Sequence, residues 1–254
     1  AMLPVGFWLP KTYAVASTPV AAIFTIMTKV GIYAILRVNG TVFDDAMAQS
    51  IFKNTLLLIG LITSIYGVIG AIGAERLRRF VGFMVLSSVG TLLIAIAMFN
   101  TQAWSAGLYY LVHSTLIAAA FYLFCGWITA QRGMFKDHLK VAPKIKNEKA
   151  AALTYFLIAM MMAGLPPFSG FLGKVFILQA TAETAYQGWI IAIILIVSLL
   201  SILALTRVGF ILFWRASPPE IDPNEAAYQT YQGLPAYAPN RNDTAIYIIL
   251  AGLM

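Results

Sequence analysis

Long apolar runs alternate with short polar segments along the whole of this chain. A helix rises about 1.5 Å per residue, so roughly 20 apolar residues are needed to cross a hydrocarbon core about 30 Å thick. Runs of that order occupy residues 18–38, 51–73, 79–99, 103–129, 150–182 and 186–214. Shorter apolar stretches at 1–10 and 243–254 match the end of one span and the start of another. Because the runs lack the alternation of barrel strands, we predict an all-α fold. It is a polytopic transmembrane helix bundle with about six complete spans and two truncated ones.

The composition indicates that part of the protein surface contacts lipid and not water. Hydrophobic residues make up 60% of the sequence and charged residues 11%, against about 25% charged in a soluble domain. The net charge of +7 could suggest nucleic acid, but the basic residues lie between the apolar runs, as membrane-flanking charges do. We therefore expect a lipid bilayer and no nucleic acid as a partner. The single cysteine, Cys125, lies in an apolar run, which excludes a disulfide framework.

The connecting loops fall into two groups by their content of Lys and Arg. Loops 74–79 and 130–149 are rich in Lys and Arg, whereas 39–50, 100–102 and 183–187 contain neither residue. Basic loops stay on the cytoplasmic side of a membrane. The alternation along the chain therefore predicts that 74–79 and 130–149 are cytoplasmic.

Lys29 lies near the middle of a predicted span, at the depth of the hydrocarbon core. It follows Thr18 by eleven residues, roughly 16 Å along a helix axis. A cation near the bilayer centre costs at least about 2.5–3.5 kcal/mol, and such residues are usually functional. Thr25, Lys29 and Tyr33 are spaced by four, which places them along one helix face. We predict a hydrated interior path along this face. The alternative is a buried lysine paired structurally with a carboxylate.

The run 150–182 is interrupted near its middle. The interrupting residues are glycines and prolines: Gly164, Pro166, Pro167 and Gly170. Proline removes a backbone donor and breaks a helix, so we predict a discontinuous helix in which Ser169 caps the second half. Broken helices at membrane depth line cavities and recur at transporter ion sites. Lys174 follows the break, where a helix N-terminus would oppose its charge. The alternative is a kink with a structurally paired lysine.

His113 lies near mid-depth of the run 103–129, four residues after Tyr109. This spacing places the two side chains on one polar helix face, and we predict both for the path. Histidine titrates near neutral pH and can relay protons, although a satisfied core histidine is the alternative. Glu183 lies near the outer end of its span and is a candidate for an exit or rim group. No ligand spacing for a metal, nucleotide cradle or nucleophile–base pair is present. We therefore predict no catalytic site, no metal and no cofactor.

Four segments resemble one known family in their amino-acid residues and in their order along the chain. They are PVGFWLPKTYAVASTPVAAIFTIMTKVGIYAILR at 4–37, ERLRRFVGFMVLSSVGTLL at 75–93, LYYLVHSTLIAAAFYLFCG at 108–126 and AGLPPFSGFLGKVFILQA at 163–180. The chain resembles the antiporter-like membrane subunits shared by respiratory complex I and Mrp-type (Pha-type) cation/proton antiporters. The resemblance is strongest to the D-type subunits of the multisubunit Na⁺(K⁺)/H⁺ antiporters.

The resemblance implies a fourteen-helix fold with two inverted five-helix repeats and discontinuous seventh and twelfth helices. Residues 1–254 would form a single transmembrane domain that runs from the end of helix 7 to the start of helix 14. Lys29, His113 and Lys174 match the family's lysine of helix 8, histidine of helix 11 and terminal lysine of helix 12. Where many relatives carry a further lysine on helix 11, this chain has Ile117 and Ala118.

The family implies a secondary ion transporter that moves protons, coupled to Na⁺ or K⁺. It would work within a hetero-oligomeric complex in the bacterial plasma membrane. One alternative is a proton-pumping subunit of NADH-quinone oxidoreductase or a related hydrogenase. A structural membrane scaffold is the alternative of another class. A lipid-modifying enzyme is remote, because no catalytic constellation supports it.

Overall fold

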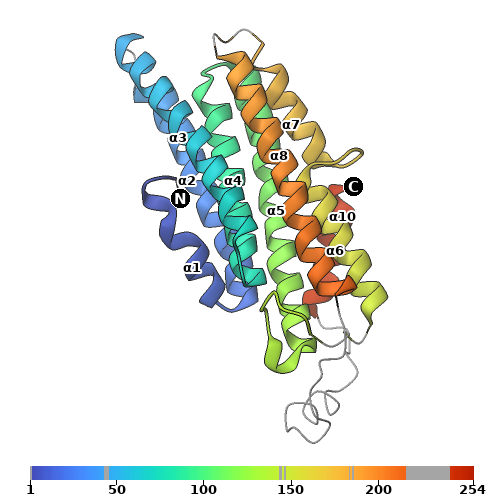
Figure 1. Ribbon diagram of the computed structural model, residues 1–254. Helices are drawn as coiled ribbons and strands as arrows, with labels where there is room; N and C mark the ends of the chain where they lie inside the picture. Colours follow the sequence, from blue (N-terminus) through green and yellow to red (C-terminus); the bar gives the residue numbers. More distant parts are fainter. Residues whose placement is uncertain are drawn as a thin grey trace, which may run out of the picture.

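The computed structural model describes residues 2–42, 46–142, 145, 147–182, 184, 186–215 and 241–254. Its regular elements within these residues are helices: η1 (Val5–Phe7), α1 (Trp8–Val15), α2 (Thr18–Val42), α3 (Ala46–Ile72), α4 (Leu77–Ala97), α5 (Thr101–Gln131), η2 (Gly133–Phe135), α6 (Glu148–Ala163), α7 (Ser169–Gln179), α8 (Gln187–Gly209), the π-helical turn η3 (Phe210–Trp214) and α10 (Arg241–Leu253). Figure 1 shows them as an elongated bundle. The predicted all-α fold is confirmed.

Among the described residues, five helices are long and apolar enough to cross a membrane. They lie at Thr18–Val38, Gln49–Ile72, Leu77–Ala97, Thr101–Gln131 and Gln187–Trp214. Each matches a predicted span to within a few residues. The sixth predicted span, 150–182, is divided into α6 and α7, as the glycines and prolines indicated.

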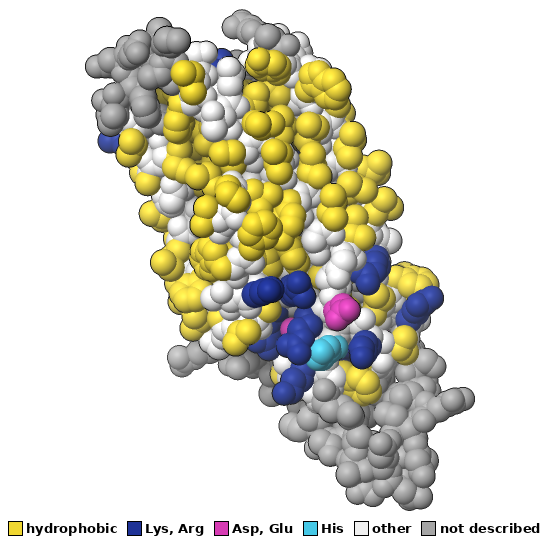
Figure 2. All heavy atoms as spheres, turned by 60° about the vertical axis from the view of Figure 1, so that its left-hand side comes forward, with side chains coloured by type: hydrophobic (Ala, Val, Ile, Leu, Met, Phe, Trp, Pro, Cys, Tyr) yellow, Lys and Arg dark blue, Asp and Glu magenta, His cyan; other side chains and the backbone are white. Residues whose placement is uncertain are grey.

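α4 lies at the centre of the bundle. In its most apolar window, 94% of the residues are buried, against 33% in α2 and in α8. α3 packs against α4 at close range, because a Cβ at Gly67 or Gly90 would collide with the backbone of the facing helix. On the face that Figure 2 shows, hydrophobic side chains are spread over the middle of the bundle, which suits contact with lipid.

The two basic loops meet at one end of the bundle. Leu77 N donates to Asp137 O at 2.7 Å, and Arg78 Nε lies 3.9 Å from Asp137 Oδ2. The buried Arg132 guanidinium donates to the carbonyl oxygens of His138 and Lys140 at 2.6 and 2.7 Å. Burial lowers the pKa of Arg132 to about 10, which leaves it charged at neutral pH. Figure 2 shows Lys and Arg side chains gathered at this end, as expected of two loops on one side of a membrane.

Candidate functional site

Lys29 is buried in the bundle, with 1% of its surface exposed. Its Nζ donates to Ser88 Oγ on α4 at 2.6 Å, and Ser88 Oγ donates to Val85 O at 2.7 Å. The ion pair Arg78–Asp137 lies elsewhere in the described part of the chain, and the hydrogen bond described for Lys29 goes to a hydroxyl. A hydroxyl therefore meets Lys29, where the structural alternative expected a carboxylate.

The buried face of α2 explains this orientation. Thr25, Lys29, Ile32 and Leu36 are buried at spacings of three and four, the period of a helix packed on one side. Tyr33 is 45% exposed, because each step of four residues drifts by about 40° around a helix with 3.6 residues per turn. The structure thus brings Thr25 and Lys29 to the buried face and leaves Tyr33 off it. A role for Tyr33 in the path stays a prediction.

The break between α6 and α7 follows the glycine–proline sequence. Gly164 ends α6 with φ +76°, a left-handed conformation that favours glycine. Pro166 and Pro167 are exposed in the turn that follows. The predicted cap is wrong, since the N-cap position of α7 is Phe168 and has no side-chain bond. Ser169 is the first residue of α7, and its hydroxyl faces other helices.

Lys174 reaches back across the break. Helical side chains point toward the helix N-terminus, and Lys174 Nζ donates to Ala163 O at 2.6 Å and to Ser198 Oγ on α8 at 3.0 Å. Ala163 is the last residue of α6, where carbonyls lack helical partners and carry partial negative charge. The sequence predicted that this amine lies near the positive start of α7, and the structure adds the negative end of α6 as its bonding partner. The ammonium group caps the negative end of α6.

His113 bridges the same break from α5. It is 4% exposed, its Nε2 lies 3.1 Å from Met161 O, and its Nδ1 lies 2.9 Å from Ser169 Oγ. Because a carbonyl oxygen only accepts, Nε2 carries the proton of that bond. Gly170 leaves room for the ring, since a Cβ there would lie 2.6 Å from Nε2. The histidine therefore contacts both halves of the broken helix.

Tyr109 was predicted to share a polar face with His113. The structure leaves Tyr109 40% exposed, in an edge contact with the ring of Phe176. The next residue, Tyr110, is buried and faces inward. A path role for Tyr109 stays a prediction, and Tyr110 is a residue that the sequence did not single out.

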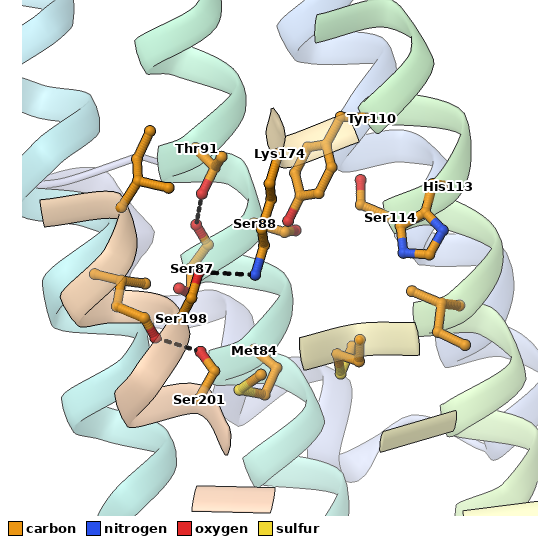
Figure 3. A pocket seen from close by; sticks show the side chains of 14 residues that line it. Met84, Ser87, Ser88, Thr91, Tyr110, His113, Ser114, Lys174, Ser198 and Ser201 are labelled. Carbon is orange, nitrogen blue, oxygen red and sulfur yellow. Dashed lines mark hydrogen bonds between the residues drawn. The ribbon is translucent and has the colours of Figure 1, made fainter. Parts of the chain in front are cut away.

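A small polar cavity joins these groups in the middle of the bundle (Figure 3). Its volume of about 20 Å³ gives room for about one water molecule. Nine of its fourteen lining residues are polar: Ser87, Ser88, Thr91, Tyr110, His113, Ser114, Lys174, Ser198 and Ser201, with Met84, Ile117, Met162, Ile194 and Val197 as the apolar ones. The cavity therefore connects the hydroxyl bonded to Lys29 with the amine of Lys174.

The hydroxyl residues of α4 and α8 were missed by sequence reasoning. Ser87 and Thr91 are four residues apart, and Ser198 and Ser201 three apart, each pair within an apolar helix. That spacing was a usable signal, because it places two polar groups on one face. Among the described residues no group of three or more His, Cys, Asp or Glu could hold a metal ion. Glu183 lies outside the described residues.

Comparisons with known proteins give a consistent family. The family model described as NADH:quinone oxidoreductase/Mrp antiporter, TM, matches residues 1–202. The D-type subunit of a probable K(+)/H(+) antiporter from Rhizobium meliloti (strain 1021) is 33% identical, over 84% of this chain and 45% of the relative. The D-type subunit of the Na(+)/H(+) antiporter of Bacillus subtilis (strain 168) is 31% identical, over 92% of this chain and 46% of the relative.

A solved structure agrees with these relatives. A chain of the Mrp complex from Dietzia sp. DQ12-45-1b matches with a TM-score of 0.77 and 31% identity, over 86% of this chain and 40% of that chain. The chain spans about half the length of the curated relatives it matches.

Proposed function

The chain belongs to the NADH:quinone oxidoreductase/Mrp antiporter transmembrane family, and on that premise we propose that it carries protons within a multisubunit monovalent cation/proton antiporter. The relatives named as D-type subunits of K⁺/H⁺ and Na⁺/H⁺ antiporters support this choice. The chain is a transporter component rather than an enzyme. Its partners would be the other subunits of such a complex, as in the matching Mrp complex.

One observation carries the proposal: the buried Lys29 and the half-buried Lys174 are each bonded to a serine hydroxyl that lines one cavity. Lys29 bonds to Ser88, Lys174 bonds to Ser198, and both serines line the cavity. A hydroxyl donates and accepts at once, so it can pass a proton between an amine and a water molecule. His113 lines the same cavity. Proton transfer would run from Lys29 through Ser88 and the cavity to Lys174 or His113.

The test is exchange in membranes that contain the whole complex. A proton gradient is formed in inverted vesicles, and Na⁺ or K⁺ is then added while a pH-sensitive dye reports proton release. We expect release with at least one of the two cations, and none from vesicles whose complex lacks this chain. Equal release with and without the chain would contradict the proposal.

A redox-driven pump is the second candidate, because the family description also covers NADH:quinone oxidoreductase. The same vesicles separate the two functions. Exchange that persists without NADH and quinone is expected of an antiporter. Proton uptake that appears only when NADH reduces quinone would identify the redox-driven complex instead.

We infer further that the chain lies in the bacterial plasma membrane with loops 74–79 and 130–149 in the cytoplasm. Single cysteines at the exposed positions Gln102 and Lys140, in a Cys125→Ala background, test this sidedness. A membrane-impermeant maleimide should label Lys140→Cys only in inverted vesicles and Gln102→Cys only in intact cells. Labelling of Lys140→Cys from outside the cell would reverse the orientation.

A further inference from the structure

Ser169 lies where three helices meet the imidazole of His113. Its Oγ is 2.9 Å from His113 Nδ1 and 2.8 Å from the carbonyl oxygen of Leu253 on α10. The other ring nitrogen, Nε2, donates to Met161 O on α6. One ring and one hydroxyl therefore connect α5 to α6, α7 and α10.

The number of protons in this cluster limits its bonding. Leu253 O can only accept, so that contact uses the single hydroxyl proton of Ser169. The Nδ1 contact then needs a proton on the ring, and both bonds form together when His113 is an imidazolium. In the neutral ring with its proton on Nε2, Nδ1 is an acceptor. The hydroxyl must then choose between Nδ1 and Leu253 O.

We propose that Ser169 is a positioning residue whose hydroxyl takes two orientations set by the proton on His113, and that it transmits this state to α10. The inference rests on the proposed function, in which His113 exchanges protons. With a neutral ring, the hydroxyl donates to Nδ1. On proton uptake, Ser169 gives its proton to Nδ1 and takes one from a hydronium ion, which leaves as water. One proton is gained in total, and the new O–H donates to Leu253 O.

The imidazolium state gains the stronger set of bonds. Its Nδ1–H donates to Ser169 Oγ in a charge-assisted bond, and the hydroxyl is released to hold α10. α10 should therefore be held more firmly when His113 is protonated.

The groups around His113 couple its protonation state to that of Lys174, the second proposed proton carrier. Lys174 from α7 lines the same cavity, as does the neutral Tyr110 of α5. From α4 and α8 the lining side chains are uncharged, from α6 the cavity is met by a methionine, and Lys29 of α2 reaches it through a serine. Within the described residues, no carboxylate lines the cavity. Lys174 and His113 interact electrostatically, so a proton on one opposes a proton on the other.

A cysteine on α10 can report this bond. Gly252 is exposed and a Cβ there meets nothing within 4 Å, so Gly252→Cys in a Cys125→Ala background should leave packing unchanged. The whole complex in membranes is labelled with a small maleimide at a series of pH values, and this chain is separated on a gel. At each pH, the labelling rate of this Gly252→Cys protein is divided by the labelling rate of the same protein that also carries Ser169→Ala. The thiol's own ionisation cancels in that ratio.

We expect the ratio to fall several-fold on acidification, because the bond to Leu253 slows the opening of α10. Ser169→Thr keeps the hydroxyl and should behave like the parent protein. A ratio that is constant with pH, in complexes that still exchange cations for protons, would overturn the inference and leave the proposed function in place. A Ser169→Thr protein that matches Ser169→Ala would overturn it too. Absence of exchange in the parent complex refutes the proposed function, and the labelling ratio still decides the role of Ser169.

Discussion

Replacement of Lys29 by alanine is expected to abolish cation-driven proton exchange while the complex still assembles. The change removes the buried amine and its 2.6 Å bond to Ser88, so the described route from α2 into the cavity has no proton carrier. Lys29→Arg should also fail largely, because a guanidinium stays protonated and cannot pass its proton on. The measurement is cation-induced proton release from inverted vesicles, with assembly checked on a native gel.

Two comparisons make the Lys29 result specific. Lys11→Ala removes an exposed lysine and should leave exchange unchanged. Ser88→Ala should lower the rate by about tenfold or more, since hydrogen bonds to charged groups contribute roughly 1.5–3 kcal/mol. Ser88→Thr keeps the hydroxyl and should retain much of the rate. Full exchange in Lys29→Arg would show that the position needs only charge and that no proton passes through it.

Lys174→Ala is expected to slow exchange severely, with Lys174→Glu no better. The ammonium group of Lys174 caps the last carbonyl of α6 at Ala163. Without it, that carbonyl loses its described donor, and the cavity loses the group that faces Ser198. A carboxylate at position 174 would be repelled by the negative end of α6. The measurement is proton flux in inverted vesicles across a pH series.

The control for Lys174 is Lys140→Ala, an exposed lysine in a basic loop, which should exchange at the parent rate. The glutamate variant is the sharper of the two substitutions. If Lys174→Glu kept clearly more activity than Lys174→Ala, the side chain would act from the positive end of α7. The contact with Ala163 would then have no part in transport.

The spans and the break could be predicted because their causes are local in sequence. Apolar length defines a span, and Gly164 with Pro166 and Pro167 interrupts a helix wherever it lies. Burial of Lys29 could also be expected, since a cation at that depth must turn away from lipid.

The partners of the lysines could not be predicted in the same way. Ser88 and Ser198 lie 59 and 24 residues from the lysines that they bind, and only the packing of helices brings them together. The direction in which a helical side chain points could not be predicted from spacing either. A four-residue spacing predicted an inward Tyr109, whereas the packed helix turns Tyr110 inward. A long side chain can also bond far from its own backbone: Lys174 belongs to α7, and its Nζ donates to Ala163 O at the end of α6.

A helix that meets almost no lipid can change its polarity without changing how the protein sits in the membrane. α4 is such a helix, with 94% of its most apolar window buried. A hydroxyl gained or lost on α4 therefore costs little against the bilayer, whereas the same change on the outer faces of α2 or α8 would meet hydrocarbon. We expect variation among descendants of this chain to adjust the number of hydroxyl groups through α4, and to keep α2 and α8 apolar on their outer faces.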